Sequence, residues 1–232
     1  MKLRFSHQRN QALTRTEATV VIATLAVLFV LLLPALVPVV HNGRLRINCI
    51  SNLKQIGIAY RLWENDNNDK YPMAVSVTNG GAMELVATGN VAACFQVMSN
   101  ELSTPKILIC PEDTRRVRAT NFSTGFDNSH ISYFVGLDAA ETNPQMFLSG
   151  DDNFAISGVP VKSGLLELSS NAPAAWFSGR HVSRNSHFWT PARYRFVGNI
   201  GMADGSAQQF TTDGLQKALQ QTGVATNRLA IP

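Results

Sequence analysis

The longest uninterrupted apolar stretch of the chain runs from Ala18 to Val40 and contains no charged residue. A helix needs about 20 such residues to cross the hydrocarbon core of a membrane, so the length of this stretch fits a full crossing. A secretory signal peptide does not account for it, because the apolar core of such peptides is only about 7–15 residues long. A buried helix of a soluble protein seldom lacks charge over this length while Lys and Arg flank it on both sides. The pattern therefore predicts a membrane-spanning helix over 18–40.

Two prolines, Pro34 and Pro38, lie near the distal end of this apolar stretch. Proline lacks a backbone N–H group and its ring crowds the preceding turn, so it disturbs a helix at that point. We therefore expect the helix to be kinked or locally melted near these two residues.

A helical pattern continues after the membrane stretch. Between residues 44 and 66 the apolar side chains recur at steps of three or four, which is helical spacing. These residues are Ile47, Ile50, Leu53, Ile56, Tyr60 and Trp63. The polar run from Asn65 to Lys70, followed by Pro72, is expected to end the helix. We therefore expect one N-terminal helix over 13–70, half in the membrane and half packed on a globular domain formed by residues 71–232.

Beyond Tyr71 the pattern changes to short apolar pieces separated by Gly, Pro, Asn and Asp. Four of them predict strands of an antiparallel sheet, at 106–111, 131–137, 173–179 and 196–210. Within the last piece, 203–206 is predicted to form a two-residue hairpin turn. Thr212 is predicted to cap a short helix that runs to Gln221, with Gly223 as its stop. The predicted fold class is α+β, with a long N-terminal helix packed on an antiparallel β-sheet.

Composition and charge narrow the class of protein. Hydrophobic residues make up 45% of the chain and charged residues 16%, which is below the roughly 25% of typical soluble chains. The net charge is +4, and four basic residues precede the apolar stretch: Lys2, Arg4, Arg9 and Arg15. The remainder is close to neutral and shows no basic stripe, so a nucleic-acid partner is not expected.

Glu17 is an ionisable residue placed one position before the apolar stretch, where a charge needs a partner or a function. The segment Ala12-Leu13-Thr14-Arg15-Thr16-Glu17 resembles the N-terminus of type IV prepilins and type II secretion pseudopilins. The resemblance implies a basic leader over 1–12, cleavage between Ala12 and Leu13 by a prepilin peptidase, and methylation of the new N-terminus. It also implies that Glu17 pairs with the N-terminal amine of a neighbouring subunit during assembly. Without such a neighbour, Glu17 is an interfacial carboxylate near Arg15.

Some residues of this chain differ from the family pattern, and other segments of the chain match it. Ala12 stands where the family has glycine, Leu13 where it has phenylalanine, and Pro34 where it has a kinking proline. The segment 52–73 looks like the corresponding part of a planctomycete and verrucomicrobial class of prepilin-like proteins. That class also ends in a strand-turn-strand with Asp-Gly, matched here by Asp204 and Gly205, but Tyr194 stands where the class has histidine. The resemblance implies a pilin-like fold.

The three cysteines, Cys49, Cys94 and Cys110, are too few and too widely spaced for a zinc site. If the domain lies outside the cytoplasm, one disulfide and one leftover thiol are possible, and we favour Cys49 with Cys110 because each opens or closes an ordered segment. Three buried, unpaired cysteines are the alternative.

Common catalytic motifs are absent from the sequence. It contains no G-x-S-x-G elbow, phosphate-binding loop, H-E-x-x-H or dinucleotide fingerprint, so we do not expect an enzyme. Asp138, Asp151 and Asp152 would supply oxygen ligands to calcium if their loops converged. Because Asp next to Gly is also ordinary turn chemistry, we expect turn residues here and no cofactor.

The expected function is that of a structural subunit of a type II secretion pseudopilus. Its partners would be like subunits, a prepilin peptidase, and secretion or pilus assembly proteins in the inner membrane. Four basic residues before the span against three after it, Arg44, Arg46 and Lys54, favour an extracytoplasmic, periplasmic domain. The alternatives are a type IV pilus subunit for adhesion, motility or DNA uptake, and a membrane-tethered ligand-binding or enzymatic domain.

Overall fold

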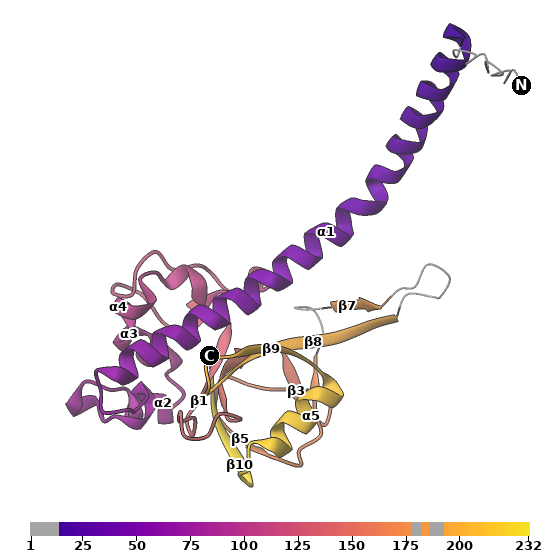
Figure 1. Ribbon diagram of the computed structural model, residues 1–232. Coiled ribbons are helices and arrows are strands. Elements are labelled where there is room, and N and C mark those ends of the chain that lie inside the picture. Colours follow the sequence, from indigo (N-terminus) through magenta and orange to yellow (C-terminus); the bar gives the residue numbers. More distant parts are fainter. Residues whose placement is uncertain (1–13, 178–181, 186–192) are drawn as a thin grey trace, which may run out of the picture. The chain divides into compact units, whose positions relative to one another are not determined.

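A computed structural model of the protein describes residues 14–177, 182–185 and 193–232 (Figure 1). The chain divides into two compact units, one up to Arg44 and one from Leu45 to Pro232, and each is described by itself. Helix α1 has the bounds Arg15–Asn65, so its first part belongs to the first unit and its last part to the second.

In the first unit, α1 exposes its apolar side chains. The window Arg15–Leu32 is long and apolar enough to cross a membrane, and none of it is buried against other parts of the protein. The exposed fraction of its large apolar side chains lies between 49% for Val21 and 67% for Leu31. The helix assignment continues over Pro34 and Pro38, whose side chains lie outside the described part. The expected bend at these prolines stays a prediction.

The second unit begins with the end of α1, which stops within the polar run as expected. The backbone N–H groups of Asn67 and Asp69 both donate to the carbonyl oxygen of Glu64, at 2.9 and 3.2 Å. Asn68 and Asp69 take left-handed backbone conformations, with φ of 56° and 55°, and Asn and Asp adopt that region more readily than most residues. These bonds close the last turn of the helix and turn the chain away from its axis.

Short helices follow α1 in place of the first predicted strand. Their bounds are η1 Pro72–Ala74, η2 Val77–Asn79, α2 Met83–Ala87, α3 Val91–Val97, α4 Ser99–Leu102, η3 Pro105–Leu108 and η4 Asn128–His130. The strand predicted at 106–111 is therefore wrong. Pro105 takes the first helical position and the side chain of Thr104 accepts a hydrogen bond from the Lys106 N–H, which together start a 3₁₀ turn.

The remaining strands form two antiparallel sheets. The larger sheet has the order β5-β10-β1-β2-β8-β7, with β9 also paired to β8, and the smaller one has the order β4-β3-β6. The strands of the larger sheet are β1 Tyr133–Gly136, β2 Phe147–Asp151, β5 Gly164–Ser169, β7 Val182–Asn185, β8 Arg193–Met202, β9 Ala207–Thr211 and β10 Thr226–Ile231. Those of the smaller sheet are β3 Phe154–Ile156, β4 Val159–Pro160 and β6 Ala174–Trp176. The predicted strands at 131–137, 173–179 and 196–210 are confirmed.

The larger sheet is covered on both faces. Successive side chains of a strand point to opposite faces, and accordingly Tyr133 and Val135 of β1 pack in the same apolar cluster as the last part of α1. Phe134, between them in the chain, packs in a second cluster with Leu215 of helix α5, Thr212–Gln221. Because both faces of the sheet bury apolar side chains against helices, the mixed α+β class with a long N-terminal helix is confirmed.

Two local predictions near the C-terminal hairpin need correction. The turn between β8 and β9 encloses three residues rather than two, because the Met202 N–H donates to the Ser206 carbonyl at 2.8 Å. The Gly205 N–H donates to the Met202 carbonyl at 2.9 Å, and Gly205 takes φ +82°. This is a tight turn followed by a left-handed glycine, which also suits a hairpin. Helix α5 ends at Gln221 as predicted, but its cap is Thr211 rather than Thr212, since the Thr211 hydroxyl accepts the Gly214 N–H at 3.2 Å.

Candidate functional site

Glu17 lies in the first turn of α1, where it forms a capping box with Thr14. The Glu17 carboxylate accepts hydrogen bonds from the Thr14 backbone N–H at 2.9 Å and from the Thr14 hydroxyl at 2.8 Å. The Thr14 hydroxyl oxygen also accepts the Glu17 N–H at 3.3 Å. Such a reciprocal pair satisfies backbone donors that the start of a helix leaves open. Glu17 therefore has a local structural role in the single chain, and its T-x-x-E spacing is a signal that the sequence offers directly.

The other N-terminal residues of interest are only partly covered by the structure. Ala12 and Leu13, the predicted cleavage and methylation positions, lie outside the described residues, as does the predicted leader over 1–12. Leu13 directly precedes Thr14 in the sequence, so cleavage there would leave both residues of the capping box in the mature chain.

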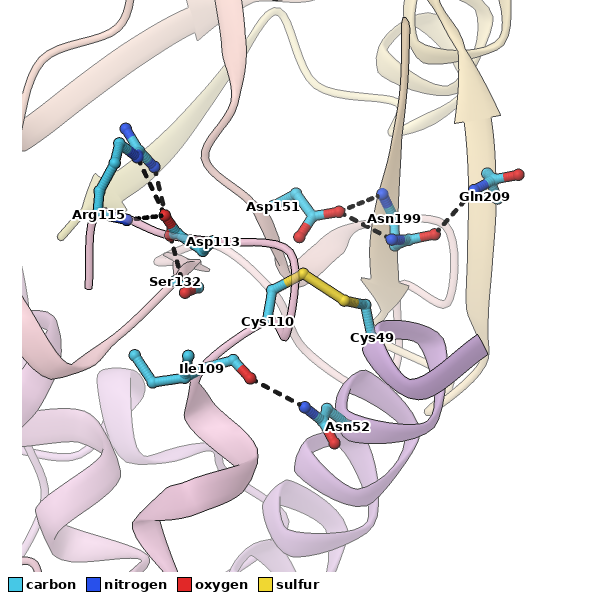
Figure 2. Close-up of a disulfide and its surroundings, with 10 residues drawn as sticks. All are labelled: Cys49, Asn52, Ile109, Cys110, Asp113, Arg115, Ser132, Asp151, Asn199 and Gln209. Carbon is cyan, nitrogen blue, oxygen red and sulfur yellow. Dashed lines mark hydrogen bonds and ion pairs between the residues drawn. A yellow bond between two sulfur atoms is a disulfide. The ribbon is translucent and has the colours of Figure 1, made fainter. Parts of the chain in front are cut away.

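A disulfide joins Cys49 of α1 to Cys110, as Figure 2 shows, with the two Cα atoms 5.2 Å apart. This is the pairing favoured from the sequence. One helical turn further on, the Asn52 side chain donates to the Ile109 carbonyl at 3.2 Å. Both cysteines of the bridge are fully buried. The bridge and the amide bond together fasten the last part of α1 to the segment that leads into β1.

The third cysteine, Cys94 of α3, is free and buried. Its thiol lies 3.2 Å from the hydroxyl of Tyr60 on α1. Burial raises the pKa of Cys94 to about 12, against a smaller opposing effect of the Tyr60 hydrogen bond. Because the thiolate is the reactive form of cysteine, Cys94 is chemically inert in the folded unit.

Next to the disulfide, a network of arginines and carboxylates connects the loop after Cys110 to the end of β2. The guanidinium group of Arg115 donates to Asp113 at 3.1 Å and to Asp152 at 2.9 Å. Arg116 donates to the other oxygen of Asp152 at 3.0 Å. The Ser132 hydroxyl donates to Asp113 at 2.9 Å. Both carboxylates are buried and each of these bonds is charge-assisted. The Arg116 side chain is 14% exposed, whereas that of Arg115 is 59% exposed.

Asp151, the last residue of β2, is hydrogen-bonded to Asn199 rather than to the arginine network (Figure 2). Its carboxylate accepts the backbone N–H of Asn199 at 2.7 Å and the Asn199 side-chain amide at 2.9 Å. The Asn199 side-chain oxygen, Oδ1, in turn accepts a hydrogen bond from the Gln209 side-chain amide at 3.4 Å. Asp151 and Asn199 are fully buried, so this pair connects β2, β8 and β9 through the sheet interior.

The three calcium candidates are not brought together. In the β1–β2 pair Tyr133 lies opposite Asp151, whereas Asp138 follows the other end of β1. Five residues of extended chain correspond to about 16 Å, so Asp138 and Asp151 lie toward opposite ends of the ladder. Asp138 is paired with Arg228 instead, through the side chain and the backbone N–H at 3.0 Å. Within the described residues, no three His, Cys, Asp or Glu side chains gather to hold a metal ion.

The Asp-Gly hairpin packs against α1. A Cβ atom added to Gly57 would lie 3.2 Å from the carbonyl oxygen of Gly205 and 3.3 Å from its Cα atom. The Tyr71 hydroxyl donates to the Ala203 carbonyl at 2.8 Å and holds the same hairpin from the other side of the helix end. Glycine weakens a helix, and this close approach of two backbones gives the physical reason for Gly57.

No family model, curated protein or solved structure matches this chain.

A buried carboxylate, Glu64, lies beside this hairpin contact, and sequence reasoning missed it. Its exposed fraction is 3%, and its Oε1 atom has no hydrogen-bond partner in the described part of the chain. Burial raises the pKa of Glu64, the charge of Glu141 raises it further, and Arg61 opposes the shift. Arg61 itself forms an ion pair with Glu141 at 2.8 Å. Nothing in the polar pattern at the end of α1 distinguishes Glu64 from its exposed neighbours, and Glu141, whose charge acts on it, lies 77 positions away in the sequence.

Proposed function

We propose that this protein is a structural subunit of a membrane-anchored filament, similar to the pseudopilins of type II secretion, with a pilin-like fold. One observation carries the proposal: α1 exposes an uncharged apolar surface from Val20 to Leu32, while its last part lies in the core of an α+β unit. The last part of this helix packs on the globular unit that follows it in the chain. The apolar side chains of its first part lack a partner in the described chain. A lipid bilayer and a bundle of identical helices both supply that missing partner.

In this proposal assembly is a packing reaction rather than catalysis. The apolar helices leave the bilayer and bundle at the filament axis. The second unit of each subunit, Leu45–Pro232, is called the distal unit, and these distal units coat the outside of the filament. Cleavage between Ala12 and Leu13 creates a positively charged amine, and Glu17 of a neighbouring subunit neutralises it inside the apolar bundle. An unpaired charge in such surroundings is costly, so the pair fixes the axial register of the subunits.

The disulfide supports an extracytoplasmic position of the distal unit. Disulfides persist in oxidising compartments and are rare in the cytosol. With the unit on the periplasmic side of an inner membrane, the basic residues before the span lie in the cytoplasm, in the sense of the positive-inside rule. A type IV pilus subunit used in adhesion, motility or DNA uptake has the same architecture and remains the nearest alternative.

A second candidate is a static membrane tether that carries an extracytoplasmic binding or enzymatic unit. The capping box favours it, because the hydrogen bonds with Thr14 account for Glu17 without any neighbouring subunit. The tether needs neither cleavage after Ala12 nor a charge at position 17.

N-terminal processing tests the proposal. We expect the protein purified from membranes of its native host, or of a host that carries a prepilin peptidase, to begin at Leu13. Intact-mass analysis and N-terminal sequencing detect this, and a further 14 Da marks one added methyl group. The control is the same chain from a host without the peptidase, which should retain Met1. A chain that begins at Met1 in both hosts would contradict the filament proposal and favour the tether.

A further inference from the structure

A pocket of about 320 Å³ opens in the distal unit beside the arginine network. Its polar wall includes Arg115 and Asn153, and its apolar wall includes Phe154, Pro160, Val161 and Phe177. Pockets that bind small molecules commonly begin at about 300 Å³ and combine apolar walls with a few placed polar groups. Neither the N-terminal resemblance nor the filament proposal assigns any role to it.

The apolar wall is held in place by strand pairing. Phe154 of β3 lies opposite Trp176 of β6, and their rings meet edge to face with centroids 6.2 Å apart. The next residue, Phe177, donates its backbone N–H to the Asn153 carbonyl at 2.7 Å. Phe177 nevertheless leaves 43% of its surface exposed. A partly exposed aromatic ring in the lining of a pocket offers a flat apolar surface to a ligand.

The polar wall holds hydrogen-bonding groups that the described chain leaves unused. Asn153 is 8% exposed, and its Oδ1 atom has no partner among the described residues. Its amide nitrogen reaches only the Phe177 carbonyl, at 3.5 Å. The Nε and Nη2 atoms of Arg115 bond to Asp113 and Asp152, whereas its Nη1 atom makes no hydrogen bond within the described structure. Asn153 Oδ1 is thus a buried acceptor whose lack of a partner costs free energy until a ligand pairs with it. Arg115 Nη1 adds a donor on a side chain that is 59% exposed.

The charge of the pocket disfavours an ionic ligand. Beside the pocket, the guanidinium groups of Arg115 and Arg116 face the carboxylates of Asp113 and Asp152, two positive charges against two negative charges. An anion would meet these carboxylates, and a cation would meet the Nη1 donor of Arg115. A hydroxyl group suits both positions, because it donates to an amide oxygen and accepts from a guanidinium.

From these walls we infer that the pocket binds a neutral saccharide, one or two sugar units in size. The C–H face of a pyranose ring packs on Phe177, and its hydroxyl groups pair with Asn153 Oδ1 and Arg115 Nη1. A subunit with this site would display a sugar-binding surface on the distal unit, whether or not the chain assembles into filaments.

Saturation-transfer NMR on the full-length chain tests this inference. The protein should be solubilised in lauryldimethylamine oxide, since detergents with sugar head groups would compete for the pocket. The probes are the methyl glycosides of glucose, galactose, mannose and N-acetylglucosamine, together with maltose and cellobiose. We expect at least one probe to bind saturably, with the strongest transfer to its ring C–H protons. No saturable binding by any of the six would overturn the inference.

Two variants and one matched control assign the binding to the pocket. Asn153→Leu and Phe177→Ser should each weaken binding by roughly fivefold or more, the usual effect of losing one hydrogen bond or one apolar contact. Val77→Ser removes an equally exposed apolar side chain, 43% exposed, outside the pocket and should change nothing. Because Phe177 is exposed, its variant decides the matter if Asn153→Leu fails to fold. Wild-type affinity in Phe177→Ser would overturn the assignment.

A further comparison tests whether the preferred ligand is neutral. Glucuronate and glucosamine are charged counterparts of glucose, one negative and one positive. The neutral probe that binds should bind more tightly than either of them. Tighter binding of glucuronate or glucosamine would overturn the choice of a neutral ligand.

Discussion

Asp152 and Asp138 are both paired with arginine, but the two ion pairs have different surroundings. The Asp152 side chain is 3% exposed, and that of its partner Arg116 is 14% exposed. The pair of Asp138 with Arg228 is nearer to water, with side-chain exposures of 23% and 52%. Exposed ion pairs contribute little to stability, whereas loss of one partner from a buried pair leaves a charge without compensation.

We therefore expect Asp152→Asn to lower the free energy of unfolding by about 2–3 kcal/mol. The matched variant Asp138→Asn should lower it by less than about 1 kcal/mol. Urea unfolding followed by circular dichroism measures both. Equal effects of the two substitutions would show that burial does not set the difference between them.

Glu64 predicts a pH dependence of stability. Its pKa is raised in the folded state, chiefly by burial and then by Glu141, so the folded chain binds a proton at this site more tightly than the unfolded chain does. Ionising Glu64 therefore costs stability as the pH rises. Glu64→Gln removes that cost, and we expect the variant to gain roughly 2–5 °C in Tm relative to the wild type between pH 5 and pH 8.

Thermal unfolding of both proteins at the two pH values tests this. The exposed carboxylate Glu167 supplies the control, because Glu167→Gln should shift Tm equally at pH 5 and pH 8. A Tm difference between Glu64→Gln and the wild type that shrinks with rising pH would mean that Glu64 is stabilised as a carboxylate.

At the scale of elements, two substitutions in the first turn of α1 distinguish the helix-capping role of Glu17 from the role of its charge in assembly. Gln replaces Glu in a capping box without loss of the hydrogen bond, so Glu17→Gln removes the charge and keeps the cap. Thr14→Val removes the capping hydroxyl and keeps the charge, at a cost of about 1 kcal/mol to the helix start. If the filament proposal holds, Glu17→Gln should lower the assembled fraction by about tenfold or more, equivalent to roughly 1.4 kcal/mol. Thr14→Val should assemble nearly as the wild type does.

Chemical crosslinking in membranes, followed by electrophoresis, measures the assembled fraction. Extraction with carbonate checks that both variants remain inserted in the membrane. The opposite order, with Glu17→Gln assembled and Thr14→Val not, would assign Glu17 to helix capping alone.

The disulfide fastens α1 to a segment 61 residues away in sequence. Opening a loop of that length costs about 4 kcal/mol of unfolding free energy in the chain-entropy estimate. We expect the double variant Cys49→Ser and Cys110→Ser to lose about that amount, and a reductant to lower the Tm of the wild type but not that of the double variant. Cys94→Ala is the control, and it should still respond to the reductant. A single reactive thiol in the denatured, unreduced protein is the second readout, and three would exclude the bridge.

Several elements could be predicted from the sequence because their signals are local. The end of α1 follows from the polar run and Pro72, and the strands at Tyr133 and Ala174 follow from β-rich apolar pieces between turn residues. Helix α3 could not be predicted in this way. Five of its residues, Val91 to Phe95, are buried, so the run is apolar on all sides and shows no helical period.

At the scale of the whole molecule, the order of the strands lies beyond local patterns. Arg116 reaches Asp152 across 36 positions, and Tyr71 reaches Ala203 across 132. The sequence identified carboxylates and turns as separate pieces, but which arginine meets which carboxylate depends on that order. The candidate site shows the same limit: Glu17, the cysteines and the apolar stretch were readable, whereas Glu64 and the pocket beside Arg115 were not.

Strand β10 lies between β5 and β1 in the larger sheet, and this arrangement constrains the timing of folding during synthesis. A ribosome makes β1 and β5 well before it reaches Thr226, so both strands wait without the ladder that later joins them. The ladder between β5 and β1 is therefore completed only after β10 has been made. A chain that is threaded through a membrane channel while still being translated would emerge with open strand edges, which are prone to aggregate.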